Sequence, residues 1–364
     1  MDRRKFVKAT GLAGIAGLAT ACARREPGAA DCEAGAGARF EWKMVTAWPR
    51  DFPALGTGAS RLAENIGKLS NGRLTIKVFG ANELVPPLQV FDAVERGTAE
   101  MGHAASYYWK GKVPSSQVFC GVPFGMTAQE LNGWLYYGGG LELWREAYAP
   151  FGIIPFPVGN SGVQMGGWFN REINSLEDLQ GLKMRIPGLG GEVLRRAGGT
   201  PVGTPGPEIF MALQTGTIDA TEWIGPLNDR AFGLHRAGKY YYYPGWHEPG
   251  TALEGLVNQE AFKALPADLQ QVVATACQAA CLDMLSEFMA RNGQALAEIR
   301  AGGTELRAFP DDVIRELKRI TVEVLDELAA KDAMSAKAYT SFLEHFEQVR
   351  GWSELAERYY LNNR

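Results

Sequence analysis

The sequence contains one short unit twice. The segment VFDAVERGTAEMGHA, residues 90–104, aligns without gaps with IFMALQTGTIDATEW, residues 209–223, which begins 119 residues later. Each copy reads as a helix, a Gly-Thr turn and a strand. A common unit of this kind can match by chance, but strand-like stretches also precede both copies, RLTIKVFG in one and GLKMRIPG in the other. We therefore expect two similar α/β lobes, with a ligand cleft between them at the carboxyl ends of the strands.

The first part of the folded chain alternates strands with helices. Strand patterns at residues 40–48 and 73–79 enclose an amphipathic helix pattern at 59–70, which ends in the Asn71-Gly72 turn. A helix at 88–96 and a strand at 99–104 follow. This alternation predicts an α/β domain with a largely parallel sheet.

From about residue 261 nearly every pattern is helical. The apolar stripe Val313, Leu317, Ile320, Val324 and Leu328 recurs at helical spacing. Such a stripe is typical of core packing, and the alternative is an interface with a partner. The predicted fold is thus α/β and two-lobed, with a cleft between the lobes and a helical C-terminal region.

Composition excludes several classes. The chain has 364 residues, 46% hydrophobic and 21% charged, which is typical of a soluble globular protein of two ordinary domains. Its net charge is −4 with both signs interspersed, so nucleic acid is not an expected partner. Cys120, Cys277 and Cys281 lack metal-ligand spacing and are expected to pack as small apolar side chains. The four histidines lie far apart and are expected to be structural.

The first 22 residues read as an export signal. RRKFVK resembles the twin-arginine type throughout, and a short Gly/Ala-rich apolar stretch follows it. Ala19-Thr20-Ala21 offers a cleavage site, whereas ATAC, ending at Cys22, resembles a lipoprotein box and would give a lipid anchor. Residues 23–39 read as a flexible linker, so the folded part comprises residues 40–364.

Arg185 is the first candidate site residue. In GLKMRIPG, Lys183 and Arg185 share one strand face, and Pro187-Gly188 ends the strand directly afterwards. An arginine there can be an ordinary surface residue. As a binding residue it would offer a planar fork of donors to a carboxylate.

Two further candidates lie at chain breaks. Gln164 stands in the glycine-rich run 159–167, where it could be a buried turn residue or an acceptor for a cation or a solute hydroxyl. Glu248, between His247 and Pro249, would by itself read as a solvated loop carboxylate.

Glu222 and Trp223 align with His103 and Ala104 of the first copy, and so fall at a strand end that faces the cleft. Two carboxylates, one amide and one backbone carbonyl provide oxygen ligands for a hard cation. A cation and an arginine can together neutralise a small organic anion.

The motifs GVQMGGWFN, GLKMRIPG, TEWIGPLND and HEP occur in this order. They resemble solute-binding proteins of tripartite ATP-independent periplasmic transporters, in the subgroup that binds 2-oxo and 2-hydroxy monocarboxylates with a metal ion. The resemblance runs from about residue 40 to the final helices.

This resemblance implies that Arg185 clamps the solute carboxylate and that Gln164 contacts solute and metal. It implies that Glu222, Trp223 and Glu248 bind the metal, sodium or calcium. The first lobe's aromatic contact maps to Tyr108 or Tyr107. The implied partners are the membrane permease and, as in some members, a second copy bound through the C-terminal helices.

The function expected from the sequence is non-catalytic delivery of a small carboxylate to a permease. A twin-arginine-exported enzyme acting on a small organic acid is the alternative, although GLGGEVLRRAGG fails the dinucleotide spacing and no nucleophile has an evident base. A structural or sensory domain without a closed polar pocket is a third class.

Overall fold

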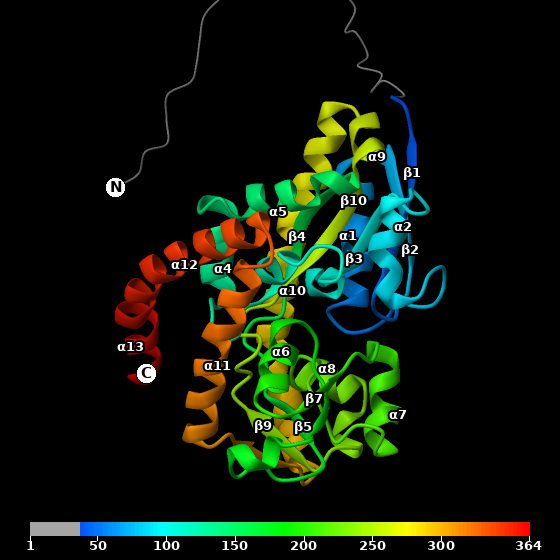
Figure 1. Ribbon diagram of the computed structural model, residues 1–364. Coiled ribbons are helices and arrows are strands. Elements are labelled where there is room, and N and C mark those ends of the chain that lie inside the picture. Colours follow the sequence, from blue (N-terminus) through cyan, green and yellow to red (C-terminus); the bar gives the residue numbers. More distant parts are fainter. Residues whose placement is uncertain (1–36) are drawn as a thin grey trace, which may run out of the picture. The chain divides into compact units, whose positions relative to one another are not determined.

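The computed structural model describes residues 37–364. Residues 39–364 form one compact unit, and the expected signal peptide, most of the linker and Cys22 lie outside the described residues. The unit contains two lobes, each built on its own sheet, as Figure 1 shows.

The first lobe holds a five-stranded sheet. Its strands, in spatial order, are β2 (Leu74–Phe79), β1 (Phe40–Thr46), β3 (Met101–Ala104), β10 (Ala252–Asn258) and β4 (Ile153–Asn160). β1 runs parallel to β2 and β3, whereas β10 is antiparallel to both β3 and β4.

The second lobe holds a six-stranded sheet. Its order is β11 (Glu305–Ala308), β9 (Tyr240–Tyr243), β5 (Gly167–Phe169), β8 (Ala220–Thr221), β6 (Lys183–Arg185) and β7 (Thr200–Val202). β6 is parallel to β7 and β8, and β5 is antiparallel to β8 and β9. The two lobes are confirmed. Each sheet is largely parallel as predicted, but it contains one antiparallel strand, β10 in the first lobe and β5 in the second.

The repeated unit has the same structure in both lobes. Helix α2 (Val90–Glu95) leads to β3 in the first lobe, and α7 (Ile209–Gln214) leads to β8 in the second. The expected correspondence between GLKMRIPG and RLTIKVFG was wrong. GLKMRIPG forms β6, which lies between β7 and β8 and is parallel to both, and in the first lobe β1 lies in the same way between β2 and β3. RLTIKVFG forms β2, whose counterpart is β7, because β2 is the edge strand beside β1 and β7 is the edge strand beside β6.

The remaining helices surround the sheets (Figure 1). They are α1 (Gly56–Leu69), α3 (Ser116–Cys120), α4 (Ala128–Tyr137), α5 (Gly140–Tyr148), α6 (Gly188–Arg196), α8 (Pro226–Ala231), α9 (Gln259–Ala264), α10 (Ala267–Ala301), α11 (Asp311–Ala329), α12 (Ala333–Ser353) and α13 (Tyr359–Asn362). Helix α1 buries Leu62 and Ile66 and ends where Asn71 and Gly72 adopt left-handed backbone conformations, with φ of 52° and 72°. The expected Asn-Gly turn is confirmed.

Helix α10 ties the lobes together. It packs on β4 and α1 of the first lobe and on α8 of the second. By length and composition alone it could cross a membrane. Its buried face, which includes Val273, Met284 and Phe288, instead belongs to the protein's hydrophobic core.

The C-terminal stripe is core. Val313, Leu317, Ile320, Val324 and Leu328 are all buried on α11, which packs against α6 and α12. The partner-interface interpretation is therefore wrong for this stripe. Cys120, Cys277 and Cys281 are free and buried, as the sequence predicted.

Candidate functional site

Two candidate residues lie on segments that cross between the lobes. Gln164 follows β4, and Glu248 lies between β9 and β10. Their backbones are tied together: the Gln164 amide donates to the Glu248 carbonyl at 3.3 Å, and the Gly245 amide donates to the Gln164 carbonyl at 3.0 Å. A change in the angle between the lobes therefore acts on both residues together.

The other candidates of the second lobe follow two neighbouring parallel strands. Arg185 ends β6, and Glu222 and Trp223 follow β8. The Glu222 amide donates to the Arg185 carbonyl at 3.2 Å, and the Met165 amide donates to the Ile224 carbonyl at 3.0 Å. Gly188 starts α6 with φ of +61°, so the chain leaves β6 abruptly as predicted.

Arg185 and Glu222 form a buried ion pair. Their side chains are 3% and 0% exposed, and Arg185 Nη1 donates to Glu222 Oε1. Arg185 also donates to the Thr204 carbonyl at 3.1 Å and stacks over Trp223, with 5.0 Å from its Cζ to the ring centroid. Burial alone would lower the Arg185 pKa, but the facing Glu222 carboxylate and nearby groups hold that pKa above its usual value. The surface-residue interpretation of Arg185 is wrong.

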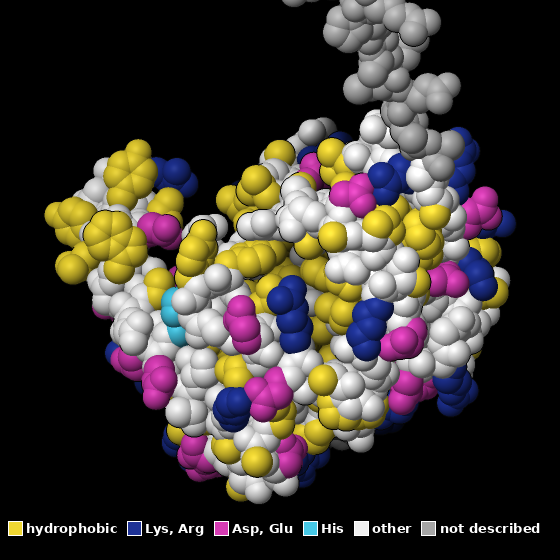
Figure 2. Space-filling model, turned by 90° about the horizontal axis from the view of Figure 1, so that it is seen from above, with side chains coloured by type: hydrophobic (Ala, Val, Ile, Leu, Met, Phe, Trp, Pro, Cys, Tyr) yellow, Lys and Arg dark blue, Asp and Glu magenta, His cyan; other side chains and the backbone are white. Residues whose placement is uncertain are grey.

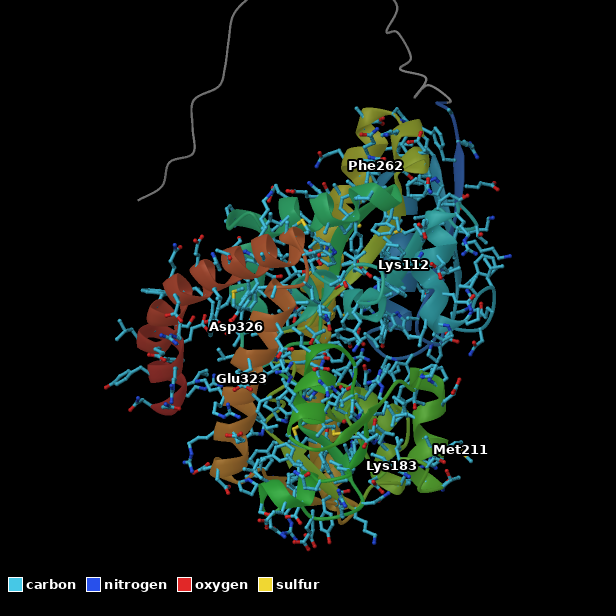
Figure 3. The ribbon with its side chains drawn as sticks, viewed as in Figure 1. Lys112, Lys183, Met211, Phe262, Glu323 and Asp326 are labelled. Carbon is cyan, nitrogen blue, oxygen red and sulfur yellow. The ribbon has the colours of Figure 1, made fainter. Side chains whose placement is uncertain are left out.

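Lys183 has a different environment. It begins β6, which Arg185 ends, and it is exposed whereas Arg185 is buried. Figure 3 labels Lys183 in the second lobe. The difference arises because the first lobe covers only the Arg185 end of the strand, where the Tyr108 hydroxyl lies 3.5 Å from Arg185 Nη2.

Gln164 and Glu248 meet in a polar cluster. The Gln164 amide nitrogen donates to Glu248 Oε2 at 2.7 Å, and the Thr251 hydroxyl donates to the same oxygen at 2.6 Å. Glu248 is 4% exposed, so the solvated-loop interpretation is wrong. Burial, followed by the charge of Glu222, raises the Glu248 pKa to about 7. A nearby cation would offset both effects.

Several oxygen atoms at this site are free to bind a cation. Gln164 Oε1 and Glu222 Oε2 are buried and have no hydrogen-bond partner among residues 37–364. The Trp223 carbonyl likewise accepts no hydrogen bond within that range, whereas the Ile224 carbonyl after it does. The ligand atoms of Glu222, Glu248 and His247 lie within 4.8 Å of one another. These unpartnered oxygens fit a hard cation such as sodium or calcium.

A small cavity lies next to these groups. Trp48 and Leu55 line it from the first lobe, Trp223 and Ile224 from the second, and Gln164 and Glu248 from the crossing segments. Tyr107 and Tyr108 both line it, and Tyr108 alone is bonded to Arg185. Its volume is about 10 Å³, room for about one water molecule.

The lobes are closed over this cavity. Phe52 of the first lobe stacks on Phe232 of the second, with 4.1 Å between ring centroids. The Asn228 side-chain amide donates to the Pro53 carbonyl across the same boundary at 2.8 Å. A solute therefore enters only when the lobes separate.

Sequence reasoning missed two neighbours of the site. His247 was treated as an isolated histidine, but its Nε2 lies 3.4 Å from Glu222 Oε2 and the side chain is 1% exposed. Thr251 positions the Glu248 carboxylate. The sequence could have indicated His247 and Thr251 as site residues only through their closeness to Glu248 in the chain.

Residues 44–332 match the family model described as bacterial extracellular solute-binding protein, family 7. A periplasmic protein of Nostoc sp., named as binding monocarboxylate 2-oxoacids, is 46% identical over 323 residues, which is 88% of each chain.

Solved structures of solute-binding proteins are also similar to this chain. A periplasmic solute-binding protein from Colwellia psychrerythraea, with bound calcium and pyruvate, is 45% identical, with a TM-score of 0.87 over 90% of this chain and 100% of that one. One from Pseudoalteromonas atlantica, with sodium and pyruvate, has the same identity and TM-score, over 90% and 99% of the two chains. A dimeric one from Bordetella bronchiseptica, with calcium and picolinate, is 38% identical, with a TM-score of 0.88 over 89% and 97%.

Proposed function

We propose a function from one premise: this chain belongs to bacterial extracellular solute-binding protein family 7. It is the periplasmic receptor of a tripartite ATP-independent periplasmic transporter, and it delivers a small carboxylate to the membrane permease. We assign its solute to the 2-oxo or 2-hydroxy monocarboxylates and its cation to sodium or calcium. This assignment is supported by relatives of similar sequence that carry pyruvate or picolinate with these ions.

One observation carries the assignment to particular residues. A single buried guanidinium, Arg185, faces two buried carboxylates, Glu222 and Glu248, beside unpartnered oxygen atoms. The site therefore has a positive group for one solute carboxylate and an excess of oxygen ligands for one cation.

Each residue then has a distinct role. Arg185 binds the solute carboxylate, and Tyr108 contacts the solute from the first lobe. Glu222, Glu248, the Trp223 carbonyl and the Gln164 amide oxygen hold the cation, and Gln164 and the Trp223 indole also contact the solute. When bound, the cation supplies positive charge that offsets the second carboxylate and attracts the solute's oxygen atoms.

Closure follows from the positions of these groups. Arg185, Glu222 and Trp223 belong to the second lobe, and Tyr107, Tyr108 and Trp48 to the first. A solute held by the second lobe completes its contacts only when the first lobe covers it, so binding favours the closed form.

The alternative of an exported enzyme receives less support. The family consists of solute-binding proteins, and the charged groups of the site are already engaged with one another rather than with a nucleophile and its base. A sensory or structural domain without a polar pocket is disfavoured by the buried polar cluster around Gln164.

Replacing Arg185 tests the carboxylate clamp. We expect Arg185→Ala to weaken binding of pyruvate by about 2–5 kcal/mol, because it leaves the solute and Glu222 without their counter-charge. This corresponds to roughly 30-fold to several thousand-fold in Kd, measured by calorimetry with calcium present. Arg185→Lys keeps the charge but loses the planar fork, so it should recover only part of the affinity.

Lys183→Ala is the matched control, since Lys183 lies on the same strand but is exposed away from the cavity. It should change the pyruvate Kd by less than about twofold. Binding that survives Arg185→Ala but is lost in Lys183→Ala would show that the clamp is on the wrong residue.

Replacing Glu222 tests the link between cation and solute. Glu222→Gln removes one carboxylate charge from the site, so we expect calcium affinity to fall about tenfold or more. Pyruvate affinity should fall with it, because coupling between two ligands is reciprocal. Calorimetric titration of each ligand, with and without the other, measures both effects.

Glu254→Gln is the control for that experiment. Glu254 is equally buried, bonded to Trp109 and Tyr148, and does not line the cavity. Its calcium affinity should equal that of the wild type. The proposed link between cation and solute is refuted if wild-type protein binds pyruvate equally well with the cations present and in calcium- and sodium-free buffer.

Export is proposed to use the twin-arginine route, because RRKFVK matches its signal. We expect Arg3→Lys with Arg4→Lys to leave folded precursor in the cytoplasm, as detected by cell fractionation and immunoblotting. An unchanged periplasmic yield would contradict the route. The mass of the exported wild-type protein distinguishes cleavage after Ala21 from lipidation at Cys22.

We also propose a homodimer formed through the C-terminal helices. Beyond the buried stripe of α11, the last helices expose Trp352, Leu355, Tyr359, Tyr360 and Leu361, between 52% and 79% of each side chain. These apolar side chains gather on a projecting part of the surface in Figure 2. A solvated monomer gains nothing from such a face, and a second copy would bury it.

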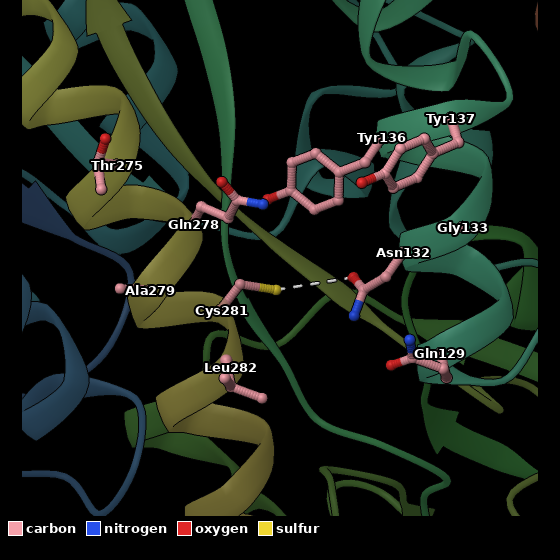
Figure 4. Close-up of a pocket in the computed structure, with 10 residues that line it drawn as sticks. All are labelled: Gln129, Asn132, Gly133, Tyr136, Tyr137, Thr275, Gln278, Ala279, Cys281 and Leu282. Atoms are coloured by element: carbon pink, nitrogen blue, oxygen red, sulfur yellow. Dashed lines mark hydrogen bonds between the residues drawn. The ribbon is translucent and has the colours of Figure 1, made fainter.

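A receiving surface lies between α4 and α10. A cavity of about 530 Å³ there is lined by Tyr136 and Tyr137 from α4 and by Gln278 and Leu282 from α10 (Figure 4). Tyr137 is 93% exposed and Leu282 68% exposed, so apolar area is uncovered on this side as well.

The dimer is tested by charging its helix. We expect Leu355→Asp with Tyr359→Asp to halve the mass in size-exclusion chromatography with light scattering, because carboxylates cannot be buried there without a partner. Pyruvate affinity should stay unchanged, as the site lies elsewhere. A wild-type protein that is monomeric at micromolar concentration would contradict the proposal.

A further inference from the structure

Asp229 is a buried carboxylate just behind the proposed cation site. It lies in the first turn of α8 and is 1% exposed. Among the described residues, its carboxylate accepts hydrogen bonds only from uncharged groups. One oxygen, Oδ2, accepts from the Trp168 indole at 3.0 Å and from the Tyr241 hydroxyl at 2.7 Å. Burial raises its pKa to about 6, and the donors around it use both of its oxygens as acceptors.

The other oxygen holds the backbone next to Trp223. Asp229 Oδ1 accepts from the Ile224 amide at 3.2 Å and from the Gly225 amide at 3.0 Å. The Ile224 amide and the Trp223 carbonyl belong to one peptide unit, which is trans. In a planar trans peptide the N–H and C=O bonds point in opposite directions. Binding the N–H to Asp229 therefore turns the Trp223 carbonyl away from Asp229.

The Trp223 carbonyl differs from its neighbours in this turn, because the carbonyls on both sides of it accept hydrogen bonds. The Glu222 carbonyl before it accepts from Arg185 and from the Thr221 hydroxyl, and the Ile224 carbonyl after it accepts from the Met165 amide. Within residues 37–364 the Trp223 carbonyl accepts no hydrogen bond, although Trp223 as a whole is only 5% exposed. A carbonyl left without a partner in a buried turn is costly unless a ligand uses it.

We propose that Asp229 is a positioning residue for the cation: by fixing the Trp223–Ile224 peptide unit, it presents the Trp223 carbonyl as a metal ligand. The inference rests on the proposed function, since it assumes a cation at Glu222 and Glu248. Asp229 does not touch the cation in this account; it acts through the backbone. Outer partners of this kind orient ligands and affect affinity strongly.

The experiment uses terbium(III) as a luminescent probe for the calcium site in the full-length protein. Asp229→Asn is isosteric, but one acceptor oxygen becomes an NH₂ group, which cannot accept from the Ile224 and Gly225 amides in one orientation or from the Trp168 indole in the other. The side chain can no longer satisfy all four donors, so the turn is held less firmly. We expect its terbium and calcium affinities to fall about tenfold or more. Luminescence lifetimes in H₂O and D₂O should report about one additional water on the ion, in place of the lost carbonyl.

Tyr241→Phe is the matched control. It removes a hydrogen bond from the same carboxylate, but on Oδ2, and leaves both backbone contacts of Oδ1 in place. It should lower the melting temperature as Asp229→Asn does, yet keep the wild-type affinity and water count. If Asp229→Asn does not fold, Asp229→Ser, whose side chain is too short to reach both amides, must show the same loss.

The outcomes separate the two proposals. Wild-type affinity and water count in a folded Asp229→Asn variant would overturn the role of Asp229, and so would an equal loss in Tyr241→Phe. A wild-type protein that takes up none of terbium, calcium and sodium would instead overturn the proposed cation site itself.

Discussion

The site depends on the buried ion pair between Arg185 and Glu222. Two charges this far from water are stable only when both are paired and further hydrogen-bonded, as Arg185 is to the Thr204 carbonyl and the Glu222 carbonyl. The pair lies at the carboxyl ends of the neighbouring parallel strands β6 and β8, which point toward the cleft. It leaves one Glu222 oxygen and the nearby Glu248 without a counter-charge, which is the imbalance that a cation would correct.

The internal repeat explains why the charge lies on one side. In the first lobe the position equivalent to Glu222 is His103, which is fully buried, and its burial lowers its pKa to about 3, so it is neutral. That lobe contributes aromatic walls, Trp48 with Tyr107 and Tyr108, rather than charges. Of the two similar lobes, one thus provides the buried ion pair and the other provides the aromatic side chains that cover it.

Much of this arrangement was predictable from the sequence, because a gapless repeat places equivalent residues at equivalent strand ends. The repeat places Glu222 and Trp223 at the end of β8, and the Pro187-Gly188 break places Arg185 at the end of β6, the parallel neighbour of β8. Strand periodicity describes the face on which a side chain lies but not what covers it, so it could not separate buried Arg185 from exposed Lys183. The antiparallel strands β5 and β10, and the burial of Glu248, depend on where the chain crosses between lobes, which no local pattern encodes.

The most direct test of the account is to identify what the protein carries. Native mass spectrometry of protein purified from the periplasm, followed by analysis of the released ligand and metal, measures solute and cation together. The account predicts one 2-oxo or 2-hydroxy monocarboxylate and one sodium or calcium ion per chain. A dicarboxylate or a sugar acid, or a monocarboxylate bound with no metal, would contradict it.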